Sequence, residues 1–293
     1  MFDTIENYLD ALKSEMKDAD PALVQDALSD AREHLSLAQT VSKEKQPDLS
    51  DADALNAAIE EYGSPEETAA AYREVERRTS PALSQPVKPR SFLGRFFGVY
   101  VDPRAWGALL YMLIAFVTGV FYFTWAVTGV SLSVSLLIFI FGFPLALLFL
   151  LSVRGLALLE GRLVEALLGV RMPRRPLFSH QGMKWMDRLK ALLGDRTTWL
   201  MLVYMLLQFV LGTLYFVVIV TAISICLFFI ALPFIQLAWN IPVTFIDQRV
   251  FLPYWALGLL SFGGFLGLTL FMHMVRGMGQ LHGRMAKALL VAD

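Results

Sequence analysis

The chain has 293 residues, 56% of them hydrophobic, and a mean hydropathy of +0.54. This is too apolar for an ordinary soluble protein and indicates an integral membrane protein. The net charge of −1 hides an asymmetry, because residues 1–85 carry 19 acidic and 8 basic side chains, whereas the remainder carries 7 acidic and 17 basic ones. We therefore expect an acidic soluble domain joined to a basic membrane domain.

Residues 1–79 are predicted to form a cytosolic four-helix domain. Apolar residues recur at spacings of three and four from Phe2 to Met16, which is the period of an amphipathic helix. Asp20-Pro21 pairs an N-cap residue with a proline suited to the first helical position. Ser64 and Glu67 have the spacing of a capping box at the start of the fourth helix.

The second helix of this domain carries an acidic face. Asp26, Asp30 and Glu33 recur at three- and four-residue spacing, opposite the apolar stripe. Anionic lipid headgroups repel acidic segments, so we expect the domain to stay off the membrane. It would then be free to bind a basic protein surface through these carboxylates. The alternative is that the acids only keep a small domain soluble.

The N-terminal pattern resembles a known family. Residues 60–67 read EEYGSPEE and are followed by Ala69 and Tyr72, while Tyr8-Leu9 and Leu12 lie in the first helix. This layout is similar to the bacterial HAAS signalling domain over about residues 1–78. The resemblance implies a cytosolic module that accompanies membrane proteins working with PadR-type transcription regulators or with transport systems.

From about residue 92 onward, the sequence contains an internal duplication. Trp106–Phe123 matches Trp199–Phe216 at a shift of 93, and Val153–Leu168 matches Val275–Leu290 at a shift of 122. Because such repeats determine architecture, we expect three parts after the N-terminal domain. They are a proline-rich linker at 80–91, membrane repeat 1 at 92–176 and membrane repeat 2 at 177–293.

Each copy opens with an apolar run long enough to cross a bilayer. Trp106–Thr128 has no charged residue, and its 23 residues reach about 34 Å as a helix, against a bilayer core of about 30 Å. Thr221–Trp239 is apolar but is interrupted by Pro233, so we expect it to be re-entrant or to lie near the outer face. The other predicted spans are Ser133–Val153, Trp199–Val220 and Trp255–Val275, and amphipathic interfacial helices are predicted at 154–170 and 276–290. The predicted fold is all-α with four spans.

Basic residues set the expected orientation. They gather before the first span, in the connection 154–198 and in the C-terminal segment, so all three are expected in the cytosol of a bacterial inner membrane. Both termini are then cytosolic, and the two copies share one orientation, as parallel repeats do. The arginines expected at lipid headgroups are Arg154, Arg162, Arg276 and Arg284.

The membrane half also resembles a family. The residues 119–123 (GVFYF), 141–144 (FGFP) and Glu160-Gly161-Arg162 look like the bacterial "putative sensor" membrane domain, over about residues 92–292. These domains are best known at the N-terminus of histidine kinases. This sequence departs from that arrangement because no kinase domain follows within residues 1–293. It also departs from the family's usual Glu-Arg pair, because Gly161 stands between Glu160 and Arg162.

Known catalytic patterns are lacking in the sequence. The four histidines are far apart and have no cysteine or carboxylate at ligand spacing, and no phosphate-binding loop or nucleophile motif occurs. We expect no metal, no cofactor and no enzymatic activity. Charged groups are missing from the predicted spans, which argues against active transport.

The resemblances together imply a sensor that relays a membrane or apolar-ligand signal to a cytosolic protein such as a PadR-type regulator, without direct contact with nucleic acid. The alternative is an accessory subunit or passive conduit of a transport system, with a transport ATPase as partner. A homo-oligomer is compatible with either role. The single cysteine, Cys226, can form no internal disulfide.

Aromatic residues at equivalent places in the two copies form the candidate ligand site. We expect Tyr122-Phe123 and Tyr215-Phe216 to face each other across the copies, either lining an apolar site or packing helix against helix. Further candidate lining residues in the same spans are Tyr111, Tyr204 and Gln208.

Overall fold

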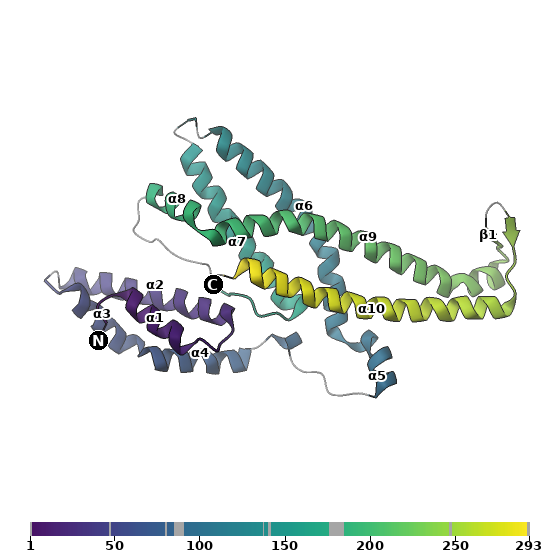
Figure 1. Ribbon diagram of the computed structural model, residues 1–293, viewed down its shortest axis with the longest axis horizontal. Coiled ribbons are helices and arrows are strands. Elements are labelled where there is room, and N and C mark those ends of the chain that lie inside the picture. The colour runs from purple at the N-terminus through teal and green to yellow at the C-terminus, as the bar shows by residue number, and fades with distance from the viewer. Residues whose placement is uncertain are drawn as a thin grey trace. The chain divides into compact units, whose positions relative to one another are not determined.

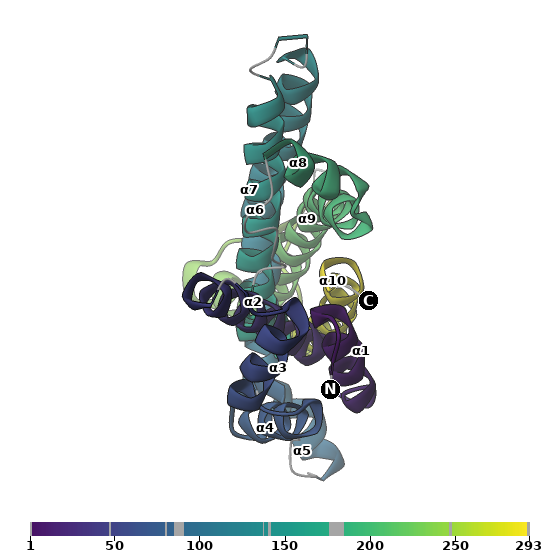
Figure 2. The same cartoon turned by 90° about the vertical axis from the view of Figure 1, so that its left-hand side faces the viewer.

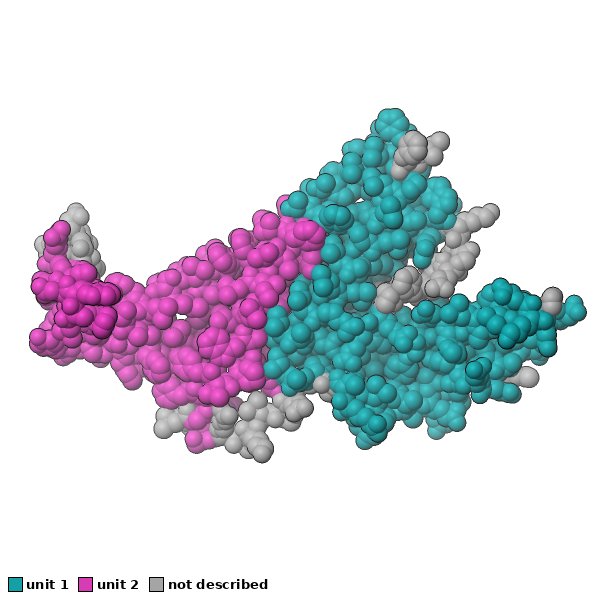
Figure 3. Space-filling view, turned by 180° about the vertical axis from the view of Figure 1, so that it is seen from behind, with its two compact units in different colours: residues 1–85, 124–205, 283–293 teal, residues 86–123, 206–282 magenta. Residues whose placement is uncertain are grey.

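The computed structural model describes residues 2–46, 48–79, 81–84, 91–136, 138–139, 142–175, 185–245 and 248–291. These residues are almost all helical, as expected, and the only strands among them form one short hairpin (Figure 1). The chain divides into two compact units (Figure 3). Unit 1 contains residues 1–85, 124–205 and 283–293, and unit 2 contains residues 86–123 and 206–282.

The N-terminal part of unit 1 is the predicted four-helix domain (Figure 2). The Asp20 carboxylate accepts from the Ala22 amide at 2.9 Å, and Ser64 and Glu67 form the expected capping box. Gly63 has φ of +107°, where a side chain would be strained, and its carbonyl accepts from the fully buried Tyr8 hydroxyl at 2.9 Å. The helices are α1 (Ile5–Glu15), α2 (Pro21–Lys45), α3 (Asp51–Tyr62) and α4 (Pro65–Thr79).

Among the described residues, four later helices are long and apolar enough to cross a membrane, which agrees with the predicted number of spans. They are α6 (Pro103–Leu136), α7 (Gly142–Leu168), α9 (Arg196–Trp239) and α10 (Tyr254–Leu290). Shorter elements lie between them: α5 (Phe92–Phe96), α8 (Trp185–Gly194), β1 (Val243–Phe245), β2 (Gln248–Val250) and two 3₁₀ turns at Ala82–Ser84 and Phe97–Val101.

The span boundaries differ from the prediction. The second span and the amphipathic helix after it form one helix, α7, and the stretch 133–136 belongs to α6. The last span and its amphipathic continuation likewise form one helix, α10. A change from all-apolar to amphipathic composition does not break a helix, because neither junction contains a proline or a turn sequence.

The separate re-entrant segment at Thr221–Trp239 is not observed, because these residues continue α9. Pro233 lies inside the helix, and Ser261 of α10 donates to the Ile230 carbonyl at 3.3 Å, which helps to satisfy the backbone near the proline. The Gln236 amide group bonds both backbone groups of Leu252, at 2.8 and 3.0 Å. α9 and α10 thus form a hairpin joined by β1 and β2 (Figure 1).

Candidate functional site

The acidic face of α2 is bonded to a short basic segment of the same unit, residues 171–175, which we call the Arg turn. The Arg171 guanidinium donates to Asp26 at 2.8 Å and to both carboxylate oxygens of Glu76 at 3.0 and 3.1 Å. Asp26 and Arg171 are only 4% and 8% exposed. Arg171 therefore joins α2 and α4 of the N-terminal domain to the segment that follows α7.

Backbone groups of the Arg turn complete the contact. The Asp26 carboxylate accepts from the backbone amides of Arg174 and Arg175, at 2.7 and 2.8 Å. Arg175 pairs with Asp30, and Arg174 donates to Glu165 of α7 at 2.7 Å. A carboxylate held by a guanidinium and two amides is well compensated for its burial.

The charge state of this cluster follows from its contacts. Burial alone would lower the pKa of Arg171, but the hydrogen bonds and charges of Asp26 and Glu76 outweigh it and raise the pKa. Burial, together with the hydrogen bond to Asp30, raises the pKa of Tyr72, which therefore stays protonated and donates to that carboxylate. Arg171 therefore stays charged, and Tyr72 stays a hydrogen-bond donor, across the physiological pH range.

A second link reaches α2 from the end of the chain. Lys287 of α10 pairs with Asp20, the N-cap residue of α2. The end of α7 is set by Gly169, whose φ of +71° suits glycine and whose missing side chain leaves room for Leu83. The ends of both copies of the repeat therefore contact the N-terminal domain within unit 1.

These contacts correct one expectation. We expected Asp26, Asp30 and Glu33 to lie free for a partner, but Asp26 is buried and both aspartates are paired with the chain's own arginines. Asp30 and Glu33 both keep partly exposed side chains, and Asp30 is 26% exposed at its side chain even in its pair with Arg175. The basic surface predicted for the acidic face is thus found in the same chain, which composition alone could not reveal.

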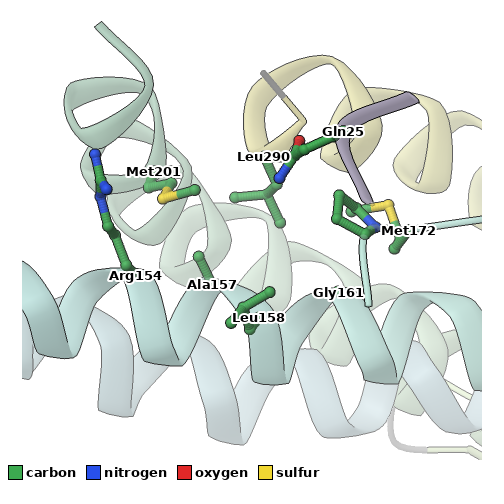
Figure 4. Close-up of a pocket in the computed structure, with 9 residues that line it drawn as sticks. Gln25, Arg154, Ala157, Leu158, Gly161, Met172, Met201 and Leu290 are labelled. Carbon is green, nitrogen blue, oxygen red and sulfur yellow. The ribbon is translucent and has the colours of Figure 1, made fainter. Parts of the chain in front are cut away.

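A small cavity lies beside this interface, lined by residues of α2, α7, α9 and α10 (Figure 4). Gln25 and Met172 border one part of it, and Arg154 and Met201 border another. Its volume is about 20 Å³, which suits a single water molecule rather than an organic ligand.

The two copies of the repeat exchange ion pairs. In unit 1, Arg154 donates to Asp195 at 2.6 Å, and in unit 2, Arg276 pairs with Asp102 at 2.9 Å. The shift of 122 makes the two arginines equivalent, and the shift of 93 makes the two aspartates equivalent. Each copy's arginine therefore pairs with the other copy's aspartate.

This pairing changes the interpretation of the four arginines predicted at lipid headgroups. Arg154 and Arg276 are engaged with aspartates, and Arg162 donates to the Arg174 carbonyl at 3.0 Å. Arg284 is exposed on α10 and remains a headgroup candidate. For three of the four arginines, protein contacts are therefore at least part of their role.

A second exchanged contact joins buried polar groups. In unit 2, the hydroxyl of Tyr111 lies 2.7 Å from His282 Nε2. In unit 1, the equivalent Tyr204 donates to Glu160 at 3.0 Å. Glu160 and His282 are equivalent at the shift of 122 and are each 1% exposed, so an acid in one copy is an imidazole in the other.

The sequence analysis missed Glu160 and His282, because both were assigned to interfacial helices. The sequence offered one signal, because Glu160 and His282 are equivalent at the shift of 122, but it did not place a tyrosine opposite either residue. Gln208 and Tyr215, two of the predicted ligand residues, belong to the same cluster. Gln208 donates to the Tyr111 hydroxyl at 3.2 Å, and the Tyr215 hydroxyl lies 3.1 Å from His282 Nδ1.

Two further predicted residues, Phe123 and Phe216, pack α6 against α9 in unit 2, whereas Tyr122 is buried beside its neighbour Phe121. Phe123 stacks on Phe209, and Phe216 stacks on Phe116, each at 4.6 Å between ring centroids. The expectation that Phe123 and Phe216 face each other is therefore wrong. The order of contacts is reversed along the two helices, so these stretches cross antiparallel, whereas we expected the copies to share one orientation.

Glycines allow this crossing. A Cβ on Gly119 would lie 2.6 Å from the Gln208 carbonyl oxygen, and one on Gly212 would lie even closer to the Ala115 carbonyl oxygen. Ala115 and Gln208 are themselves equivalent at the shift of 93. The aromatic residues therefore support helix packing at a backbone-to-backbone contact.

A larger apolar groove lies elsewhere in unit 2, between α9 and α10 beside Pro233. Its volume is about 650 Å³, and it is an open groove rather than an enclosed cavity. None of the predicted ligand residues lines it. Its lining comprises Ile230, Pro233, Leu237, Tyr254, Leu257, Gly258, Ser261, Phe262 and Phe265.

Comparison with known proteins supports both resemblances. The family model described as "Putative sensor" matches residues 111–290, and the model described as HAAS matches residues 7–71. No curated protein and no solved structure matches the chain. The first match covers more than half of the sequence and includes all four long apolar helices in whole or in part. The chain is therefore a membrane protein of the "Putative sensor" family with a HAAS domain at its N-terminal side.

Proposed function

We propose that this protein is a non-enzymatic sensor of the bacterial inner membrane that passes a signal from its membrane helices to a cytosolic regulatory protein. The observation that carries the proposal is the buried Arg171–Asp26 pair. It joins the HAAS domain to the sensor domain within one compact unit. A movement of the sensor domain at this contact would therefore displace the HAAS domain.

α7 is the element suited to transmit that movement. Near its middle, Arg154 is bonded to Asp195, which caps the start of α9. Toward its end, Glu165 is bonded to Arg174 of the Arg turn. A helix is stiff along its length, so a shift of α7 against α9 would displace the Arg turn and alter its hold on α2.

The groove beside Pro233 is our candidate for the signal input. Its lining is apolar apart from the Ser261 and Tyr254 hydroxyls, which suits an acyl chain or another apolar molecule. The proline and the Ser261 bond to the Ile230 carbonyl are features that a bound molecule would disturb.

The proposed orientation places both termini in the cytosol. Basic residues precede α6, form the Arg turn and lie near the end of α10, and clusters of basic residues favour the cytosolic side. A reporter fused after Asp293 should therefore be active only in the cytosol. Activity only in the periplasm would overturn this orientation.

Partner capture in living cells tests the function. A photoreactive amino acid at Leu37, which is exposed on α2, should crosslink a DNA-binding regulator, and PadR-type proteins are the class that the HAAS resemblance implies. The matched control position is Val75, exposed on α4. The yield at position 37 should change in the Arg154→Gln variant, because that substitution uncouples α7 from α9.

Two results would contradict the proposal. Capture of a transport ATPase would favour the alternative role as an accessory subunit of a transport system. Capture of no cytosolic protein from either position would remove the HAAS domain as the output.

A further inference from the structure

The acidic face of α2 continues into an exposed apolar one. Asp30 and Glu33 are followed, at spacings of four residues, by Leu37 and Val41, which are 49% and 45% exposed. Residues at such spacing lie on one side of a helix. Together with Asp26, these residues form a single stripe that we call the α2 stripe.

The two ends of the α2 stripe are in different states. The acidic end is occupied, because Asp26 and Asp30 are bonded to Arg171, Arg175 and the backbone amides of the Arg turn. The apolar end is exposed to solvent in a domain with its own complete core. Leu37 and Val41 lie one turn apart, so their exposed side chains form one apolar area that continues the acidic end of the stripe.

We propose that the α2 stripe is the docking surface for a basic amphipathic segment of the partner protein, and that the Arg turn is a built-in competitor for its acidic end. The inference rests on the proposed function and adds the surface and the chemistry of its partner. Arginines of the partner would take the places of Arg171 and Arg175, and apolar side chains of the partner would cover Leu37 and Val41.

The geometry explains why the built-in competitor holds the site at rest. The Arg turn belongs to the same chain, so its contact with Asp26 is intramolecular, and a separate partner must compete with it. Arg171 reaches Asp26 and Glu76 at once through different nitrogens of its guanidinium. A partner gains access when a movement of α7 pulls the Arg turn away, which makes docking conditional on the membrane signal.

The test uses the full chain in lipid nanodiscs and a fluorescent peptide with the chain's own sequence of residues 170–176, VRMPRRP. Binding is measured to the wild type and to an Arg171→Gln, Arg174→Gln, Arg175→Gln variant, in which the competitor is neutralised. The peptide should bind the variant about tenfold or more tightly than the wild type. Adding Asp26→Asn and Asp30→Asn to the variant should abolish this binding.

A smaller difference between variant and wild type, or binding that survives loss of both aspartates, would overturn the inference. Arg175→Gln alone covers the case in which the triple variant fails to fold, because Arg175 is 47% exposed at its side chain and its loss leaves the Arg171 contacts in place. This single variant should still bind the peptide more tightly than the wild type, and unchanged binding would also overturn the inference. If the protein signals through another surface, it would fail this peptide-binding test but would still capture a regulator in the crosslinking experiment.

Discussion

Arg171 lies 2.8 Å from Asp26, a residue 145 positions earlier in the chain, and both side chains are more than nine-tenths buried. Buried ion pairs contribute little net stability compared with apolar packing, but removing one partner leaves an uncompensated charge. The main effect of such a pair is therefore to specify which two surfaces meet, and its contribution to stability is smaller. In this chain it specifies that the HAAS domain meets the segment after α7.

Neutralising Arg171 should destabilise this contact strongly. We expect Arg171→Gln to lower the opening free energy of α2 by about 3–5 kcal/mol, because Asp26 and Glu76 lose their shared cation. Hydrogen exchange of α2 amides in the full chain measures this quantity. The control is Arg32→Gln, which removes an exposed pair with Glu6 at 3.8 Å and should cost less than about 1 kcal/mol. Equal effects of the two substitutions would contradict the buried pair.

Alanine at the helix crossing should be poorly tolerated. Gly119→Ala and Gly212→Ala each place a methyl group against the backbone of the facing helix, and we expect a cost of about 1–3 kcal/mol. Gly258→Ala, in α10, meets nothing within 4 Å and should be neutral or slightly stabilising, because alanine favours helix. Thermal unfolding in detergent compares the three variants. A shift of the same sign for all three would rule out the tight crossing.

The Arg154–Asp195 pair should give a defined acid dependence. Burial raises the pKa of Asp195, but hydrogen bonds from Thr198 and Thr197 and the charge of Arg154 outweigh it and hold the pKa below its usual value. A lowered pKa means that Asp195 contributes stability above about pH 4 and that this contribution is lost as the pH falls further.

The measurement is the pH dependence of thermal unfolding in detergent. Asp195→Asn should remove this part of the dependence below pH 4 and should lower stability at neutral pH, where the ionised carboxylate is bonded. If wild type and variant lose stability in parallel from neutral to acidic pH, the carboxylate does not make this contribution.

Local chemistry made much of the fold predictable. The Asp20 N-cap and the Ser64–Glu67 capping box depend on residues two or three apart, and both were confirmed. The number of membrane helices followed from apolar length. Their boundaries did not, because Arg154 and Arg276 looked like ends of spans but lie within continuous helices, paired with aspartates.

The site was predictable only where the repeat carried information. The exchanged pairs of Arg154 and Arg276 follow from equivalent positions, although the sequence does not say that copies exchange partners. The partner of Asp26 could not be deduced, because acidic spacing on a helix is the same whether its cation comes from another protein or from residue 171. Glu160 and His282 were overlooked because a polar residue on an amphipathic helix suggests solvent, and only packing shows that it is buried.

The central claim is that the Arg turn is bound to Asp26 in the resting protein, and hydrogen exchange at the backbone amides of Arg174 and Arg175 tests it most directly. Both amides donate to the Asp26 carboxylate. In the full chain in nanodiscs they should exchange at least about a hundredfold more slowly than in the free peptide of residues 170–176, and Asp26→Asn should remove most of that protection. Exchange of the wild-type amides at the rate of the free peptide would contradict the account.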